Sequence, residues 1–281
     1  MPKFCANLTM LWNELDFMDR FAAAAKAGFK GVEYLFPYDH DKNRLAGELE
    51  KHGLTQVLHN LPAGDWAKGD RGIGCHPDRV KEFQDGVAKA IEYATALGCK
   101  QLNCLAGTRP RNTDPNDARE TFIRNLQYAA PRLRDAGIKL MIEPVNTRDI
   151  PGFFLCYSKQ ALDIITAVGS DNLFLQFDLY HAQVMEGDLA RTMEVNLGLI
   201  PHMQLADNPG RNEPGTGEIN YPFLFGHLDR LGYAGWVGCE YKPKTSTDAG
   251  LGWVGPYFQR PSFPRRRESS DAPSGSPPPR G

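Results

Sequence analysis

The sequence contains no apolar run long enough to span a membrane, and its first residues, Met-Pro-Lys-Phe, do not lead into the apolar core of a signal peptide. It also has no excess of positive charge, because the 281 residues carry a formal net charge of -2. Proteins that bind nucleic acid generally present a basic surface to the phosphates. We therefore expect a cytoplasmic protein that binds neither a membrane nor a nucleic acid.

Paired cysteines are also missing: the six cysteines are scattered, and none belongs to a Cys-x-x-Cys pair. A chain of this length that is 41% hydrophobic can bury a large core without disulfide bonds. Three of the six lie inside apolar segments that resemble strands. We predict buried free thiols in a reducing compartment.

Short apolar segments recur along the chain, and amphipathic segments typical of helices separate them. Several of the helical segments end at a glycine, which is the usual helix end before a strand. The predicted strands are Lys3–Leu8, Gly31–Phe36, Leu54–His59, Lys100–Leu105, Lys139–Glu143, Leu173–Asp178, Ile200–Ala206 and Trp236–Glu240. Eight strand–helix units in a chain of this length predict an α/β protein with a single (β/α)8 TIM barrel.

The main alternative is a doubly wound open sheet, in which a glycine-rich phosphate loop usually follows the first strand. Here the first predicted strand is followed by Asn7-Leu-Thr-Met-Leu-Trp, which contains no glycine. The barrel is therefore the better prediction. We assign it residues 1–258, and we expect residues 259–281, a segment rich in proline, serine and arginine, to be a disordered tail without a catalytic role.

Four predicted strands in the second half of the chain end on an oxygen-bearing side chain, namely Glu143, Asp178, Gln204 and Glu240. In a TIM barrel the C-terminal strand ends meet at one face, where the active site lies. Each residue alone has an ordinary explanation: Asp178 could cap the next helix, and Glu240 could pair with Lys242. Together, the three carboxylates would repel one another unless a cation held them. The oxygen ligands predict a divalent cation site, with Mg²⁺ or Mn²⁺ favoured.

Other polar residues fall near the same predicted face. His181 follows Asp178 by three residues, and His59 ends the third predicted strand. Each could bind a substrate or could simply be a structural hydrogen-bonding residue. His202 precedes Gln204 by two positions, so both side chains should lie on the same side of the barrel wall.

Two loops are longer than simple connections need to be. The loop over residues 61–74 carries Trp66, a possible lid, and Arg71, whose guanidinium could bind a carboxylate in bidentate fashion. The loop over residues 207–218 is rich in glycine but lacks the Gly-Lys-Ser/Thr of a phosphate loop. Both could also be well-packed Ω-loops without a role in binding.

Five segments are long enough to serve as specific motifs, namely Phe4–Trp12, Gly31–Asp39, Leu58–Trp66, Asp207–Tyr221 and Trp236–Pro243. They closely resemble the hydroxypyruvate isomerase family, which belongs to the xylose isomerase-like TIM barrels. The resemblance extends from Met1 to about Tyr257. It implies that Glu143 and Glu240 are a pair of proton-transfer residues, and that both bind a divalent metal together with Asp178 and Gln204.

The implied reaction interconverts hydroxypyruvate and 2-hydroxy-3-oxopropanoate (tartronate semialdehyde) through a metal-stabilised enediolate. Arg71 and Lys242 are then candidates for the substrate carboxylate, and His59 and His181 for other substrate atoms. The nearest alternatives are a 2-oxo-tetronate isomerase and a ketose 3-epimerase. An apurinic-site endonuclease and a non-catalytic sugar-acid binder follow further behind. The resemblance also makes a homodimer an expectation.

Overall fold

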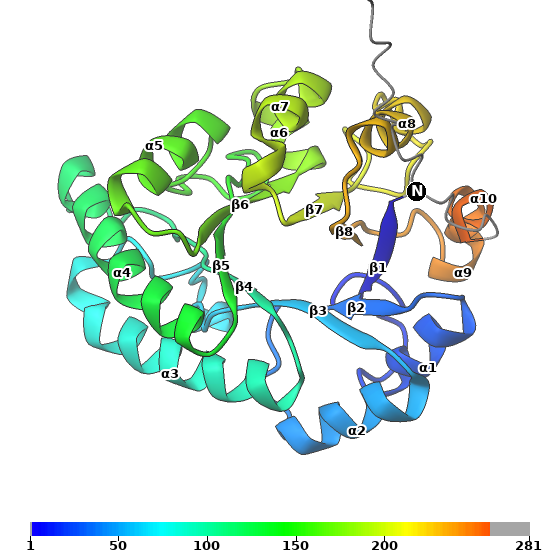
Figure 1. Cartoon of the computed structure of the whole chain (residues 1–281), viewed down its shortest axis with the longest axis horizontal. Coiled ribbons are helices and arrows are strands. Elements are labelled where there is room, and N and C mark those ends of the chain that lie inside the picture. Colours follow the sequence, from blue (N-terminus) through cyan, green and yellow to red (C-terminus); the bar gives the residue numbers. More distant parts are fainter. Residues whose placement is uncertain (1, 259–281) are drawn as a thin grey trace, which may run out of the picture.

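The computed structural model describes residues 2–258, in which eight parallel strands form a closed barrel in the order β1 to β8 (Figure 1). The strands are β1 (Lys3–Asn7), β2 (Gly31–Glu33), β3 (Thr55–Asn60), β4 (Gln101–Asn103), β5 (Lys139–Ile142), β6 (Leu173–Asp178), β7 (His202–Leu205) and β8 (Trp236–Cys239). The predicted TIM barrel is confirmed. The predicted disordered tail, residues 259–281, lies outside the described residues.

Helices surround the barrel on its outer side (Figure 1). They are α1 (Asp19–Lys26), α2 (Lys42–His52), α3 (Val80–Ala96), α4 (Pro115–Asp135), α5 (Ser158–Val168), α6 (Leu179–Met185), α7 (Leu189–Asn196), α8 (Tyr221–Leu231), α9 (Thr247–Gly250) and α10 (Gly255–Phe258), with short 3-10 turns η1 (Trp66–Lys68), η2 (Pro77–Arg79), η3 (Leu197–Leu199) and η4 (Leu251–Trp253). Among residues 2–258, no helix has both the length and the apolar character needed to cross a membrane.

Most predicted strands were too long at their C-terminal ends. The prediction ended strands at Leu8, Phe36, Leu105, Glu143, Ala206 and Glu240, whereas the observed strands end at Asn7, Glu33, Asn103, Ile142, Leu205 and Cys239. The residues just beyond the ladder are still buried, because loops fold over them. An apolar pattern reports burial and therefore does not mark the point where strand pairing stops. The third strand is the opposite case, since it continues to Asn60, one residue past its predicted end.

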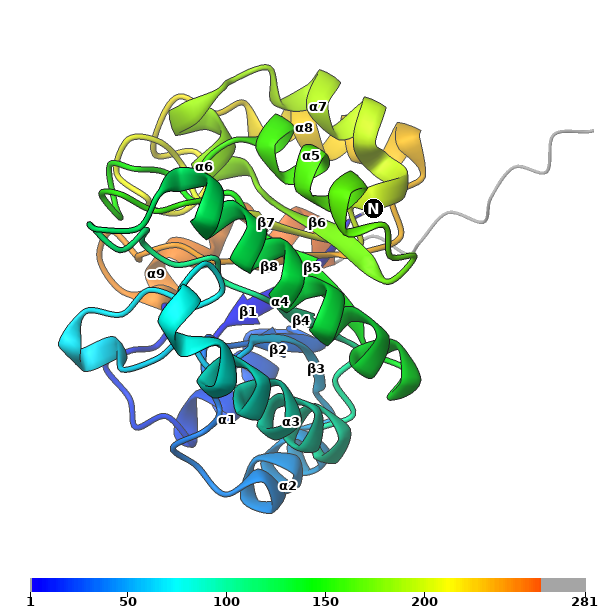
Figure 2. The same ribbon diagram turned by 90° about the vertical axis from the view of Figure 1, so that its left-hand side faces the viewer.

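The interior of the barrel has an apolar part and a polar part. Cys5, Val57, Leu58 and Met141 form a small apolar cluster separate from the main core. Polar side chains, including those of Asn7, Glu33, Gln176, His202 and Gln204, are also buried in the structure. Figure 2 shows the loops gathered at the end of the barrel opposite to the N-terminus. All six cysteines are buried and free, as predicted.

Aromatic packing joins the last helices to the first strand. The ring of Phe4 in β1 lies 5.1 Å from that of Phe225 in α8 and 5.2 Å from that of Trp253 in η4. Phe225 in turn packs edge-on against Tyr257 of α10 at 5.0 Å. These contacts between rings at the two ends of the described chain hold the final helices against the closing strand pair of β1 and β8.

We predict that Phe225→Ala lowers the free energy of unfolding by about 3–5 kcal/mol, because it removes a buried ring that contacts four other aromatic residues. Urea denaturation would measure the loss. The matched control is Phe223→Ala in the same helix, where the side chain is 50% exposed; its effect should stay below about 1 kcal/mol. Equal losses in the two variants would contradict the proposed importance of this aromatic contact.

Candidate active site

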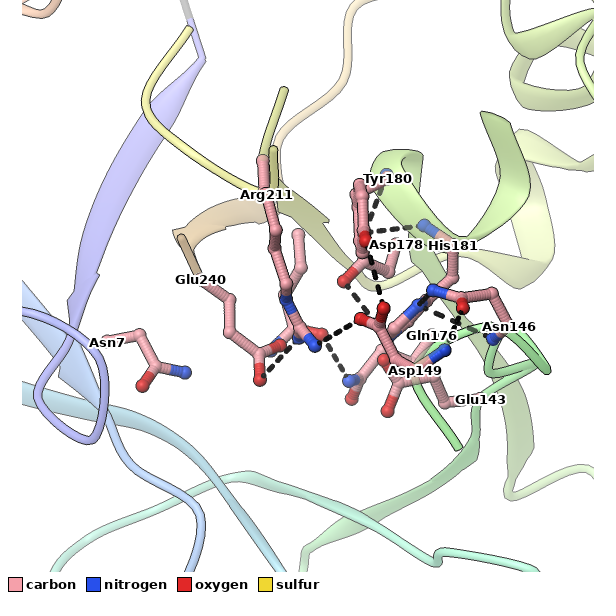
Figure 3. A network of polar contacts seen from close by, with 12 residues as sticks. Asn7, Glu143, Asn146, Asp149, Gln176, Asp178, Tyr180, His181, Arg211 and Glu240 are labelled. Carbon is pink, nitrogen blue, oxygen red and sulfur yellow. Dashed lines mark hydrogen bonds and ion pairs between the residues drawn. The ribbon is translucent and has the colours of Figure 1, made fainter. Parts of the chain in front are cut away.

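A cavity of about 570 Å³, part of it open to solvent, lies at the C-terminal face of the barrel. Its lining comes from most of the strands and the loops that follow them, so residues far apart in the sequence meet there. The polar lining residues are Asn7, Glu33, Asn60, Glu143, Gln176, His181, Gln204, Arg211 and Glu240. Glu143, Gln204 and Glu240 thus line one cavity as predicted, and Asp178 lies beside Glu143 (Figure 3). Among residues 2–258, however, Glu240 does not belong to the group of acidic and histidine side chains that are close enough to share one ion.

Asp178 has two separate tasks because its two carboxylate oxygens face different groups. Oδ1 accepts hydrogen bonds from the backbone N–H groups of Tyr180 (2.7 Å) and His181 (3.2 Å), so it caps α6. Oδ2 is fully buried and accepts no hydrogen bond within the described part of the chain. A buried carboxylate oxygen without a donor is unfavourable unless a proton or a cation satisfies it. Asp178 is therefore both a helix cap and a potential metal ligand.

Glu143, Asp178 and His181 each place one ligand atom within 4.8 Å of the other two, which is close enough to hold a metal ion. The imidazole of His181 has a second role to consider. Its Nδ1 lies 2.7 Å from Asn146 Nδ2 and 3.4 Å from the backbone nitrogen of Asn146, which can only donate. Nδ1 must then accept, and the proton lies on Nε2. His181 therefore presents a hydrogen-bond donor to the cavity, and the oxygen-bearing residues are the better metal ligands.

The amide of Gln204 is held from both ends. Its Nε2 donates to Glu33 Oε1 at 2.8 Å, and its Oε1 accepts from Gln176 Nε2 at 2.6 Å. His202, two positions earlier, places its Nε2 at 2.8 Å from the other oxygen of Glu33. The prediction that His202 and Gln204 share one side of the barrel wall is confirmed. No role was predicted for Glu33, although it lies in Gly31–Asp39, one of the segments that carry the family resemblance.

Arg211 is the main functional candidate that sequence reasoning missed. It lies in the loop over residues 207–218, and Figure 3 shows its side chain between those of Glu240 and Asp149. Its guanidinium nitrogens lie 3.4 Å from Glu240 Oε1 and 3.0 Å from Asp149 Oδ2. The same group lies over the ring of Tyr180 at 5.2 Å, and Tyr180 donates a hydrogen bond to Asp149. Arg211 is thus a largely buried, pre-oriented cation that lines the cavity.

The loop fixes Arg211 through backbone hydrogen bonds. Asp207 accepts from the N–H groups of Gly215 and Gly217 (2.9 Å each) and of Ile219 (3.0 Å), which ties the loop to itself. The backbone N–H of Lys242 donates to the carbonyl of Arg211 at 2.7 Å. Arg211 has a φ of 54°, which is uncommon for a residue other than glycine. Such a conformation persists where the surroundings enforce it, and functional sites are where it is usually found.

Burial and mutual repulsion control the protonation of the acidic residues. Burial raises the pKa of Glu240 to about 8, although the Arg211 guanidinium counteracts part of the shift. Burial also raises the pKa of Asp178 to about 6. The pKa of Glu143 is raised well above its usual range by burial and then by the charges of Glu240 and Asp178. Without a further cation, the group therefore retains protons near neutral pH.

Three of the residues predicted to bind substrate lie outside the cavity lining formed by residues 2–258. The buried ring of His59 packs edge-on against Tyr38, and burial lowers its pKa to about 4. Arg71 stacks on Trp66 at 4.3 Å and donates to backbone carbonyls of its own loop. The Lys242 side chain is exposed, while its backbone holds Arg211. His181 is the predicted substrate-binding residue that does line the cavity.

Comparisons with known proteins agree with the barrel fold and show the family to which the chain belongs. The family model described as xylose isomerase-like TIM barrel matches residues 21–257. The chain is 54% identical to the hydroxypyruvate isomerase of Escherichia coli K12 over 92% of its own length and 100% of that protein. It is 46% identical to the 2-oxo-tetronate isomerase of Cupriavidus necator, with 92% and 100% covered. A crystal structure from Brucella melitensis, described as an AP endonuclease of family 2, is 48% identical with a TM-score of 0.89, covering 92% of this chain and 99% of that one.

The raised pKa of Glu240 generates a prediction about stability. The folded, metal-free protein holds this proton up to about pH 8, whereas an unfolded glutamate loses it near its ordinary pKa of 4.5. Stability must therefore fall as the pH rises from about 5 to 8. In Glu240→Gln, which mimics the protonated form, we expect a smaller fall. Urea denaturation in EDTA at pH 5 and pH 8 would measure both proteins. An unchanged difference between the two pH values in the variant would contradict the assignment.

Proposed function

The chain belongs to the xylose isomerase-like TIM barrel family and is an isomerase, and from this premise we propose that it interconverts hydroxypyruvate and 2-hydroxy-3-oxopropanoate. The resemblance to hydroxypyruvate isomerases that the sequence suggested is confirmed by the relatives. One observation supports the proposal most strongly. Two buried glutamates from different strands of the barrel, Glu143 after β5 and Glu240 after β8, reach the same cavity, and a largely buried arginine lies beside one of them.

The proposed reaction moves one proton from C3 to C2 of a three-carbon acid and a second proton from the C3 hydroxyl to the C2 oxygen. A carboxylate must remove a proton next to a carbonyl, and an acid must return one to the adjacent carbon. Glu143 and Glu240 fit these roles because burial, the largest cause of their raised pKa values, makes each carboxylate a stronger base than one in water. These shifts belong to the metal-free protein, and a bound cation would lower both pKa values. Asn103 Nδ2 donates to Glu143 Oε2 at 2.8 Å and fixes that carboxylate.

A divalent cation fits the donor set at this site. Asp178 has a buried oxygen without a donor, and Glu143 approaches it within the range of a shared ion. We propose that Glu143, Asp178, Gln204 and Glu240 would hold such a cation, with Mg²⁺ or Mn²⁺ favoured by the oxygen ligands. When bound, it would stabilise the negative charge that develops on the substrate oxygens. It would also relieve the repulsion among the three carboxylates.

We assign the substrate carboxylate to Arg211. The sequence analysis gave this role to Arg71 and Lys242, but Arg211 is the arginine whose side chain lines the cavity. Its guanidinium is held by Asp149 and by the ring of Tyr180, so little ordering remains to be done when an anion binds. His181 Nε2–H would then donate to a carbonyl or hydroxyl oxygen of the substrate.

A second candidate is a 2-oxo-tetronate isomerase, because a relative of that name is 46% identical over nearly the whole chain. Its substrate has one more carbon, and the chemistry at the two reacting carbons would be the same. The two activities therefore differ in the fit of one end of the substrate and need the same acid–base residues.

The test is an assay of hydroxypyruvate, 2-oxo-tetronate, ketose sugars and DNA with an abasic site, each with and without EDTA. We expect isomerisation of hydroxypyruvate, followed by NMR, and loss of turnover in EDTA. In Glu240→Gln, turnover should fall by about 10²–10⁴-fold while folding is retained, because the change removes one acid–base group. Turnover close to that of the unchanged protein would refute the acid–base role, and cleavage of the DNA alone would refute the isomerase proposal.

Arg211→Lys should raise KM for hydroxypyruvate by about tenfold or more with a smaller change in kcat, because lysine cannot bind a carboxylate through two parallel hydrogen bonds. Steady-state kinetics would show the split between the two constants. Arg71→Lys is the matched control, since Arg71 bonds to its own loop and should leave KM nearly unchanged. If the control and not Arg211→Lys raised KM, the carboxylate would belong to the loop over residues 61–74.

A further inference from the structure

Glu33 is a carboxylate buried inside the barrel, with only 1% of its surface exposed, and the proposed reaction gives it no task. Its two oxygens serve different neighbours. Oε1 accepts from Asn7 Nδ2 at 3.0 Å and from Gln204 Nε2 at 2.8 Å. Oε2 is approached by His202 Nε2 at 2.8 Å and by Cys5 Sγ at 3.4 Å. One oxygen thus holds two cavity-lining amides, and the other is anchored in the interior of the barrel.

We propose that Glu33 is a positioning residue that sets the direction of the Gln204 amide and thereby maintains divalent-cation binding at the site. An ionised carboxylate can only accept hydrogen bonds. Gln204 must therefore turn its nitrogen toward Glu33, which leaves its carbonyl oxygen to face away. This inference rests on the proposed function, in which that oxygen is one of the metal ligands.

The direction of the Gln204 amide determines the direction of the Gln176 amide. Because Gln204 Oε1 faces away from Glu33, Gln176 must offer it a donor, and Gln176 Nε2 does so at 2.6 Å. The side chain of Gln176 also lies near Glu143 and contributes to lowering the pKa of that carboxyl. The two amides thus follow one another from Glu33, with Gln204 Nε2 facing Glu33 and Gln176 Nε2 facing Gln204, while Gln176 Oε1 accepts no hydrogen bond within residues 2–258. Turning Gln204 around would place an N–H where a cation needs an oxygen, and it would remove the acceptor for Gln176.

The barrel wall makes room for this carboxylate at one glycine. A Cβ atom on Gly238 of β8 would lie 2.3 Å from Glu33 Oε1 and 2.5 Å from Glu33 Cδ. Gly238 is the register partner of Gln204 in β7 and of Cys5 in β1. The absence of a side chain in β8 therefore lets Glu33 reach across to the amide of Gln204. An alanine at this position would move the carboxylate without removing its charge.

The experiment measures the dissociation constant of Mn²⁺ by EPR for the full chain and for the variants Glu33→Gln, Gly238→Ala and Cys5→Ala, with circular dichroism as the check of folding. Turnover of hydroxypyruvate is measured alongside. Glu33→Gln keeps the shape of the side chain but places a donor where an acceptor is needed. Gly238→Ala keeps the charge of Glu33 but displaces its carboxylate. Cys5→Ala removes a contact to Oε2 only and is the matched control.

We expect Glu33→Gln and Gly238→Ala each to weaken Mn²⁺ binding by about 10–100-fold, the usual effect of losing a residue that orients a metal ligand. Cys5→Ala should change it by less than about twofold. Unchanged Mn²⁺ binding in both variants would overturn the inference. So would weaker binding in Glu33→Gln alone, because the charge and not the amide direction would then be responsible. If Glu33→Gln does not fold, the Mn²⁺ dissociation constant of Gly238→Ala decides between the outcomes. An unchanged protein that binds Mn²⁺ but does not isomerise hydroxypyruvate would refute the proposed function and leave this inference open to the same measurement.

Discussion

The repulsion among buried carboxylates is the constraint on which the rest of the site depends. Glu143, Asp178 and Glu240 are each at most 5% exposed at one end of the barrel. Burial penalises each charge separately, and proximity penalises them jointly. A fold can retain such a group only if protons, a fixed cation or a bound cation offset the charge. The surrounding polar residues are best understood as the means by which this protein meets that requirement.

Part of the positive charge that offsets the carboxylates is fixed in a loop, and the rest consists of protons or a cation taken up from solution. Arg211 supplies a permanent positive charge, and Asp207 and the backbone of Lys242 hold its strained backbone in place. One guanidinium shared with Asp149 cannot neutralise three carboxylates. The remaining deficit leaves the group ready to take up protons or a divalent cation, which is the property that an acid–base isomerase requires. In the proposed mechanism, the same excess charge that makes the site costly to fold is what would equip it for proton transfer.

The sequence predicts this site only where topology determines position. Glu143, Asp178, Gln204 and Glu240 could be located because each ends a strand, and closure of the barrel brings strand ends together whatever the loops do. Arg211 and Arg71 both lie on long loops containing several glycines, and nothing local distinguishes them. Arg211 is held toward the cavity by hydrogen bonds between residues that are distant in the sequence, those around Asp207 and the one from the backbone of Lys242. Loop conformation depends on such contacts, and a pattern of residue types does not contain them.

The interior of the barrel shows a different limit of sequence reasoning and has a consequence for residue 204. An amide ends in an oxygen and a nitrogen of nearly equal size. A glutamine that binds a cation therefore needs a neighbouring group that fixes which of the two atoms faces the cation. Glu33, whose other oxygen faces His202 Nε2, accepts a hydrogen bond from Gln204 Nε2 and so fixes the direction of the Gln204 amide. A glutamine at position 204 therefore requires a hydrogen-bond acceptor beside its nitrogen. This acceptor, Glu33, in turn requires the space that Gly238 leaves in β8. Three residues on three strands, 33, 204 and 238, thus act as one unit, although no spacing in the sequence connects them.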